Sequence, residues 1–208
     1  GIGWAGPTIL QYGTEAQKER YLWPALAGEE IWCQLFSEPD AGSDLASLST
    51  RAERDGDVYV LNGSKIWTSG AHNSRFGILV ARTDPNASKH RGISYFVCPM
   101  DLPGIEVRPI QDMTTNRHFC EVFFTAVRVP RENLVGVEGA AFKQTMAQLA
   151  FERGGIDRLL SNRALYEMAL ERANTSDPLV RDEIARLETG YRIGRMLVYR
   201  EVLRQAPT

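Results

Sequence analysis

Two stretches of the sequence combine small polar side chains with backbone that is free to turn, so they are its best candidates for binding chemistry. The first, residues 34–43, reads Gln-Leu-Phe-Ser-Glu-Pro-Asp-Ala-Gly-Ser and follows an apolar run at residues 31–36. Because Pro39 cannot donate to a β-ladder and Gly42 frees the backbone, the pattern predicts a strand that ends in a loop. Backbone N–H groups and hydroxyls at a strand end can hold the polar edge of a flat ring or a phosphate.

The second stretch, residues 65–70, reads Lys-Ile-Trp-Thr-Ser-Gly. It places the broad aromatic plane of Trp67 beside the hydroxyl groups of Thr68 and Ser69 at the end of another predicted strand. This combination suits a planar heteroaromatic ligand. The alternative interpretation is an ordinary strand and loop with a tryptophan in the core, and composition alone favours it.

The order of the residues favours the ligand-binding interpretation instead. Residues 34–44 followed by residues 62–70 closely resemble the two flavin-binding signatures of the acyl-CoA dehydrogenase family, in the family's order and at about its spacing. The runs Gly-Ile-Glu-Val-Arg-Pro at 104–109, Glu-Val-Phe-Phe at 121–124 and Val-Arg-Val-Pro at 127–130 continue the resemblance. It extends over essentially the whole chain, which is similar to the middle of such a protein.

The middle third of the chain has the character of a β-domain. Four short runs there are rich in β-branched and aromatic residues, as strands are: 58–61, 78–81, 93–97 and 120–124. Asp55-Gly56 and Asn62-Gly63 are predicted to form hairpin turns. Short strands without a helical pattern between them predict a small antiparallel barrel or sandwich.

Helices are predicted on both sides of this β-region. Thr14 and Gln17 form a capping box at the start of a helix that is ended or kinked near Pro24. Towards the other end, an apolar stripe from residue 140 predicts a long helix, and Asp177-Pro178 is a start for a second helix that reaches about residue 205.

We therefore expect an α+β multidomain fold of the acyl-CoA dehydrogenase type, with a small antiparallel β-barrel or sandwich domain flanked by α-helical segments. The resemblance implies that residues 1–30 end the N-terminal helical domain and that residues 31–132 are the middle β-domain with the flavin and acyl-CoA loops. Residues 133–208 are then the start of the C-terminal helical domain, an αα-hairpin. Such a hairpin leaves apolar faces uncovered, which indicates a fragment or an obligate oligomer.

Composition narrows the classes of function. The chain has 208 residues, of which 43% are hydrophobic and 24% charged, as in soluble globular proteins. A formal net charge of −2 gives no reason to expect nucleic acid as a partner, and no apolar run is long enough to span a membrane.

Cys33, Cys98 and Cys120 match no metal-binding spacing and are predicted to be small buried hydrophobes in a reduced compartment, so we expect no metal. Because the chain begins at Gly1, we expect its N-terminus to be missing.

The resemblance implies FAD as the cofactor. Trp67 is expected to pack on the flavin ring system, and Ser69 to donate near the flavin N5 or O4. Backbone groups near Phe36 and Ser37 are expected at the pyrimidine edge of the ring. The full implied set of FAD contacts is Gln34, Phe36, Ser37, Trp67, Thr68, Ser69 and, reaching a neighbouring subunit's FAD, Arg172. The alternative for Arg172 is a simple cation at a helix C-terminus.

On the substrate side, the resemblance implies that Ser43 bonds the CoA arm and that Phe151 and Glu152 lie near the CoA moiety. The alternatives are a hydroxyl that caps its own turn for Ser43 and a solvated helix face for Glu152. Many members of the family have an arginine three positions after the acid, where this chain has Gly155. The family places a catalytic carboxylate either on a late helix beyond residue 208 or, in a minority, at the position of Gly154, so we assign no catalytic residue.

The function implied is that of an FAD-dependent acyl-CoA dehydrogenase, which acts in lipid metabolism on an acyl-CoA substrate and passes electrons to an electron-transfer flavoprotein or similar acceptor. Three alternatives remain open: an acyl-CoA oxidase or nitroalkane-oxidase-like flavoenzyme, a non-catalytic partner subunit of a mixed oligomer, and a β-domain with helical flanks used only for assembly. The expected assembly is a homotetramer or heterotetramer. The expected location is the bacterial cytoplasm, or the mitochondrial matrix if the source is eukaryotic.

Overall fold

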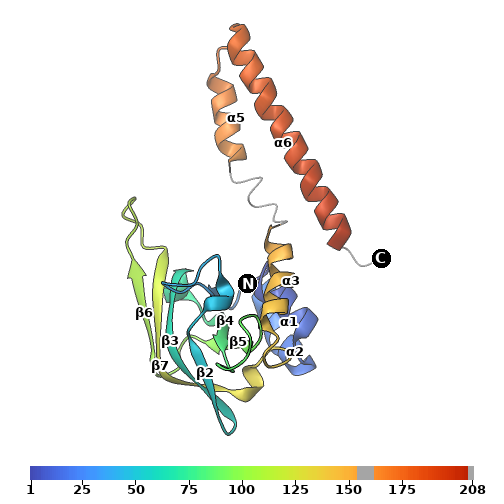
Figure 1. Ribbon diagram of the computed structural model, residues 1–208. Coiled ribbons are helices and arrows are strands. Elements are labelled where there is room, and N and C mark those ends of the chain that lie inside the picture. The colour runs from blue at the N-terminus through green and yellow to red at the C-terminus, as the bar shows by residue number, and fades with distance from the viewer. Residues whose placement is uncertain (154–161, 206–208) are drawn as a thin grey trace. The chain divides into compact units, whose positions relative to one another are not determined.

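The computed structural model describes residues 1–153 and 162–205, and the chain divides into two compact units, Gly1–Leu149 and Ala150–Thr208 (Figure 1). The first unit holds the β-sheet and the N-terminal helices. The second includes a pair of helices among its described residues and is treated separately. The three-part division that we placed at residues 30 and 132 stays a prediction.

The first unit is built on one seven-stranded sheet with the strand order β1-β4-β2-β3-β7-β6, in which β5 also pairs with β4. The strands are β1 (Trp32–Leu35), β2 (Arg51–Asp55), β3 (Val58–Ser69), β4 (Phe76–Arg82), β5 (Ile93–Pro99), β6 (Ile105–Ile110) and β7 (Phe119–Pro130). Most pairs are antiparallel, but β1 and β2 both run parallel to β4. The α+β fold class predicted from the sequence is confirmed, with a mixed sheet in place of a purely antiparallel one.

The helical elements flank this sheet. They are α1 (Ala5–Tyr12), α2 (Glu15–Leu26) and α3 (Ala141–Arg153), with short 3₁₀ turns η1 (Leu45–Ser47), η2 (Ala71–Asn73) and η3 (Arg131–Asn133). The predicted capping box opens α2: the Thr14 hydroxyl accepts from the Gln17 N–H at 3.2 Å, and the Gln17 side chain accepts from the Thr14 N–H at 3.0 Å. Pro24 lies inside α2, which continues to Leu26.

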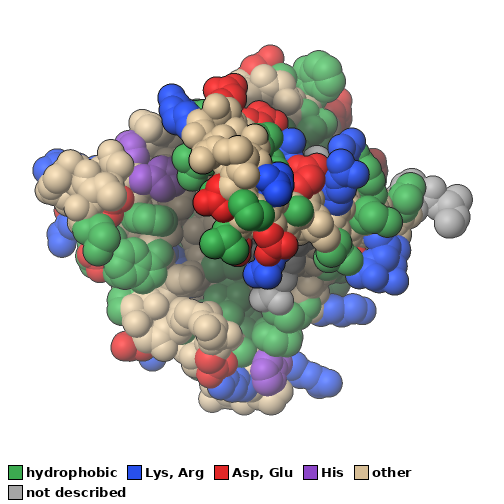
Figure 2. Space-filling view, turned by 90° about the horizontal axis from the view of Figure 1, so that it is seen from above, with side chains coloured by type: hydrophobic (Ala, Val, Ile, Leu, Met, Phe, Trp, Pro, Cys, Tyr) green, Lys and Arg blue, Asp and Glu red, His purple; other side chains and the backbone are tan. Residues whose placement is uncertain are grey.

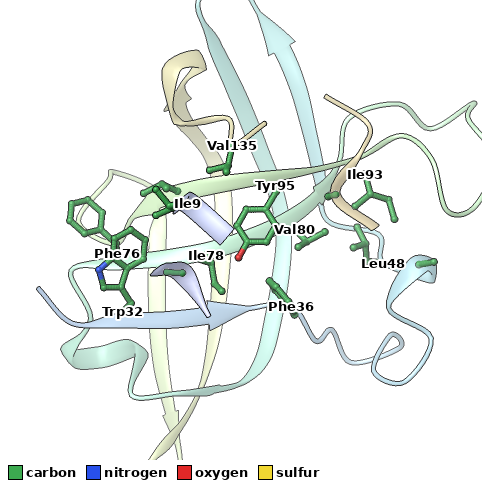
Figure 3. Packing of buried hydrophobic residues seen from close by; sticks show 14 of the residues in the cluster. Ile9, Trp32, Phe36, Leu48, Phe76, Ile78, Val80, Ile93, Tyr95 and Val135 are labelled. Atoms are coloured by element: carbon green, nitrogen blue, oxygen red, sulfur yellow. The ribbon is translucent and has the colours of Figure 1, made fainter. Parts of the chain in front are cut away.

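Strands β4 and β5 are buried on both faces, which explains their nearly continuous apolar sequence. Ile78 and Val80 of β4 point into a cluster shared with α1 and Phe36, as Figure 3 shows. The alternate residues Leu79 and Ala81 point into a second cluster with the buried side chains of β3 and β7. The sheet is therefore the central layer of the first unit, with a core on each side.

One sequence prediction about the sheet is wrong. Asn62-Gly63 was expected to form a hairpin turn, but both residues lie inside β3. The pairing of β3 with β7 shifts register between Leu61 and Gly63, and Gly63 has a φ of 145°. The glycine therefore marks a β-bulge in a long strand, and the turn chemistry of the dipeptide misled the prediction.

From residue 162 on, the described part of the second unit contains α5 (Arg163–Arg172) and α6 (Pro178–Gln205). They pack as an αα-hairpin in which the rings of Tyr166 and Tyr191 lie 5.1 Å apart. Asp177 precedes α6 as predicted, and its carboxylate accepts from the Leu179 N–H at 2.8 Å. The remaining part of the long helix expected from residue 140, including Gly154 and Gly155, lies outside the described residues.

The surface carries charges of both signs. On the face shown in Figure 2, acidic and basic side chains are interspersed among apolar ones. None of the described helices is long and apolar enough to cross a membrane.

Candidate functional site

The first predicted binding stretch folds into a tight corner, which we call the Ser37 corner (residues 36–41). Strand β1 ends at Leu35, and a turn follows in which the backbone groups of Glu38 and Ala41 exchange hydrogen bonds of 2.8 and 3.1 Å. Ser37 is half-buried, whereas the Phe36 side chain is buried and packs edge-on against Tyr95 in the core (Figure 3). Phe36 can therefore offer a ligand only its backbone, as the sequence analysis proposed.

The second stretch forms the Trp67 corner (residues 66–70) at the end of β3. Trp67 has a φ of 59°, a left-handed conformation that is strained for a bulky residue by roughly 1–3 kcal/mol. The residue is 58% exposed, and its ring meets the Phe119 ring edge-on, with the centroids 6.1 Å apart. A large apolar ring in a strained, exposed position is typical of a residue held for a ligand.

Next to Trp67, the Thr68 hydroxyl is buried and has no hydrogen-bond partner within the described part of the chain. Ser69 is half-buried beside it. A buried polar atom without a partner carries a desolvation cost that a bound polar group or water would remove. The exposed ring and the half-buried Ser69 hydroxyl therefore fit a flat, polar-edged cofactor such as a flavin.

The structure brings the two corners into direct contact. The Ile66 N–H donates to the Ser37 carbonyl at 2.8 Å. The Lys65 ammonium donates to the Phe36 carbonyl at 3.1 Å and forms an ion pair of 2.8 Å with Glu38. Residues about thirty positions apart in the sequence thus form one continuous site, and Gln34 lies half-buried on β1 just before it.

The ion pair between the corners is almost completely removed from water, with side-chain exposures of 0% for Lys65 and 4% for Glu38. Burial alone raises the pKa of Glu38, but the Lys65 charge and several hydrogen bonds outweigh it and lower this pKa to about 2. Burial lowers the pKa of Lys65 to about 8, because desolvation of the ammonium exceeds the stabilisation by Glu38. The sequence alone gave no indication of this pair, although Glu38 lies in the first motif and Lys65 in the second.

Ser43 lies exposed on the loop that follows the Ser37 corner. This loop is tied to the loop at residues 84–91 by an ion pair between Asp44 and Lys89. The Arg82 guanidinium reinforces the tie by donating to the Ala46 carbonyl at 2.7 Å and the Arg91 carbonyl at 3.2 Å.

A hollow of about 730 Å³ opens beside the second of these loops. Its lining combines the basic residues His90, Arg91 and Lys143 with the acidic residues Asp84 and Glu138. These residues carry no motif that a sequence search could have recognised, since the loop and α3 meet only in the folded chain.

The other predicted site residues belong to the second unit. Arg172 is in the last turn of α5 and donates to the Met168 carbonyl at 3.2 Å, an arrangement that suits a helix C-terminal cation. Glu152 is half-buried near the end of α3, and the Phe151 side chain lies outside the described residues. The roles of these three residues toward substrate or cofactor stay predictions.

Comparisons with known proteins agree with the architecture. Residues 33–127 match the family model described as acyl-CoA dehydrogenase, middle domain. The chain is 43% identical over 198 residues to the acyl-CoA dehydrogenase IpdE1 of Mycobacterium tuberculosis, covering 91% of this chain and 51% of that protein.

Solved structures show the same similarity. The ChsE4-ChsE5 complex from Mycobacterium tuberculosis matches with a TM-score of 0.86 and 32% identity, over 100% of this chain and 56% of that one. The Tcur3481-Tcur3483 steroid ACAD matches with a TM-score of 0.84 and 38% identity, over 97% of this chain and 54% of that one. The chain thus spans about half the length of the relatives it matches. The sheet, the joined corners and these matches together show that the chain belongs to the acyl-CoA dehydrogenase family.

Proposed function

We propose that this chain is the central part of an FAD-dependent acyl-CoA dehydrogenase that oxidises an acyl-CoA thioester to the 2-enoyl-CoA. The observation that carries the proposal is the direct contact between the Ser37 and Trp67 corners, with the strained, exposed Trp67 ring beside them. Bound FAD would supply hydride acceptance at N5. The residues of this chain would bind and orient that cofactor.

The Trp67 corner would provide one flat face and a hydroxyl donor. The exposed Trp67 ring offers its π-face to a flat heteroaromatic ring. Ser69 would donate a hydrogen bond where negative charge develops on the cofactor during reduction, which would help to set its redox potential. Backbone groups of Phe36 and Ser37 in the other corner would bind the polar edge of the ring. Gln34, Thr68 and, toward a neighbouring subunit's FAD, Arg172 complete the proposed cofactor set.

On the substrate side, Ser43 would hold the CoA arm. The tie between its loop and the loop at residues 84–91 supports this, because it places Ser43 on a loop fixed at several points. The neighbouring hollow would offer two cationic side chains, beside two acidic ones, to the phosphates of CoA. Phe151 and Glu152 remain proposed substrate contacts, and no catalytic base is assigned.

A non-catalytic partner-subunit role is the second candidate. It is supported by the matched ChsE4-ChsE5 and Tcur3481-Tcur3483 structures, whose names each pair two polypeptides. In that case this chain would complete a heterotetramer and lend one face of a flavin or acyl site to its partner. A homotetramer that passes electrons to an electron-transfer flavoprotein would support the catalytic alternative. The bacterial origin of the relative IpdE1 supports a bacterial source, and we keep the cytoplasm as the proposed location for either role.

The visible spectrum of the full-length protein that contains this chain tests the proposal. We expect a yellow protein with one FAD per chain whose flavin absorbance bleaches on addition of a matching acyl-CoA. A protein that stays colourless after FAD is added would refute the proposal. Stoichiometric FAD only in the presence of a partner subunit would select the partner role. Rapid reoxidation by oxygen without another acceptor would instead identify an oxidase.

A further inference from the structure

The two corners of the proposed flavin site are joined through a pair of charges, Glu38 and Lys65, that the sequence analysis did not assign. Glu38 belongs to the Ser37 corner, and Lys65 immediately precedes the Trp67 corner. Their charged groups are 2.8 Å apart and out of contact with solvent. The pair is therefore not one of the exposed ion pairs that occur elsewhere on this surface, such as the pair between Arg108 and Glu106.

The carboxylate end of the pair is held from several directions. One Glu38 oxygen accepts from the Ser49 N–H at 2.6 Å and the Ser49 hydroxyl at 2.8 Å. The other accepts from the Thr50 N–H at 3.0 Å as well as from Lys65. Since a carboxylate has about four acceptor positions, the Glu38 side chain is saturated and its orientation is determined by the chain around it.

The ammonium end of the pair also bonds to the backbone of the Ser37 corner. Besides Glu38, Lys65 donates to the Phe36 carbonyl at 3.1 Å, and the next residue, Ile66, donates its backbone N–H to Ser37 at 2.8 Å. Three bonds therefore bridge the corners within a short length of each strand. The backbone that these bonds hold leads directly into the left-handed conformation of Trp67.

A buried ion pair gives little stability over apolar residues of the same volume, so its presence calls for another reason. We propose that Glu38 and Lys65 are positioning residues of the flavin site, which hold the Ser37 and Trp67 corners in the mutual arrangement that binds the flavin. This inference rests on the proposed function. Neither residue is assigned contact with the cofactor or the substrate, and both would act through Phe36, Ser37 and Trp67.

The test uses the full-length protein and compares FAD affinity with stability. We expect Lys65→Met and Glu38→Gln each to raise the FAD dissociation constant at least tenfold, measured by flavin fluorescence on titrating the apoprotein. The flavin midpoint potential should shift in the same variants. The control is Val129→Ala, which removes apolar contacts in the second core cluster away from both corners and should leave FAD affinity unchanged.

The double variant Glu38→Gln/Lys65→Met separates positioning from mere stability, because it removes both charges and leaves neither buried alone. We expect its thermal stability to recover toward that of the unaltered protein while FAD binding stays weak. Recovery of both properties together, or unaltered FAD affinity and midpoint potential in the single variants, would overturn the positioning role alone. An unaltered protein that binds no FAD would overturn the proposed function and this inference together.

Discussion

Trp67 has a backbone conformation and a solvent exposure that are both unusual for tryptophan. Tryptophan seldom adopts a positive φ, yet Trp67 has a φ of 59° and a largely exposed ring. Neither feature benefits the folded chain by itself. The ion pair between Lys65 and Glu38 lies two residues before Trp67, and strained backbone of this kind persists where the surrounding structure holds it.

Replacing Trp67 by asparagine should therefore separate stability from binding. Because asparagine tolerates the left-handed region, we expect the free energy of unfolding in urea to rise by about 0.5–1 kcal/mol. Loss of the stacking face should weaken FAD binding by roughly three- to tenfold. Trp67→Phe is the control that keeps both ring and strain, and it should change neither quantity appreciably. A Trp67→Asn variant that is clearly less stable would contradict the assignment of strain.

We expect Glu38 to make the folded chain less stable at acidic pH. Its pKa is lowered to about 2 in the folded chain, against about 4.5 when unfolded, because the Lys65 charge and hydrogen bonds outweigh its burial. The ionised Glu38 carboxylate therefore contributes fully to the free energy of unfolding above about pH 5, and this contribution is lost as the pH falls toward 2. Between pH 5 and pH 2 the loss amounts to about 3 kcal/mol.

The measurement is urea unfolding between pH 7 and pH 3. The unaltered protein should lose stability steeply, whereas Glu38→Gln/Lys65→Met should lose much less over the same range. Glu106→Gln, which removes a carboxylate from an exposed ion pair, is the surface control and should leave the slope nearly unchanged. Equal slopes in the double variant and the unaltered protein would show that Glu38 does not carry the effect.

At the scale of elements, the shape of β3 determines where the residues of the Trp67 corner lie. It begins after the turn at Asp55-Gly56, contains the bulge at Gly63 and ends at Ser69. A second register shift between Lys65 and Thr68 accompanies the left-handed Trp67. Bulges re-aim the side chains that follow them, so the irregularities of β3 decide which way its last residues face.

Gly63→Ala tests the first of these irregularities. An added Cβ would lie 2.8 Å from the Thr50 backbone, and Gly63 has a φ of 145°. We expect a loss of about 3 kcal/mol in the free energy of unfolding, measured in urea. Gly56→Ala is the matched control: its φ is also positive, at 60°, but no atom lies within 4 Å, so the loss should stay near 1 kcal/mol. Similar losses in both variants would show that the Thr50 contact is unimportant.

At the scale of the whole molecule, the second unit exposes far more apolar surface than an isolated helical pair can sustain. The large apolar side chains exposed on α6 are Leu179, Leu187, Ile193, Met196, Leu197, Tyr199, Val202 and Leu203. Faces of this kind are covered in stable proteins by further helices or by other subunits.

We therefore expect the 208-residue chain on its own to self-associate as its concentration rises, observable by sedimentation velocity. The double variant Met196→Lys/Leu203→Lys should shift the distribution toward smaller species, because it places charges on the apolar face of α6. Val137→Lys, at an exposed position in the first unit, is the control and should have no such effect. A chain that sediments as a monomer at all concentrations would contradict the expectation.

The sequence by itself determined the family and the element types. The motif around Ser37, the motif around Trp67 and the capping box at Thr14 each depend on residues close together in the chain, so local order was enough to recognise them. The same locality explains the error at Asn62-Gly63. The dipeptide has turn chemistry, but pairing with β7 over the length of β3 overrode it.

Only the tertiary structure decided that the two motifs meet. The bridge between Glu38 and Lys65, the parallel pairing of β1 with β4 and the tie made by Arg82 all join residues far apart in sequence. Such contacts form when the sheet closes and removes the side chains from water, and no local pattern encodes which distant partner a buried charge will find. The physical reason is that burial, not residue type, makes these charges depend on one another.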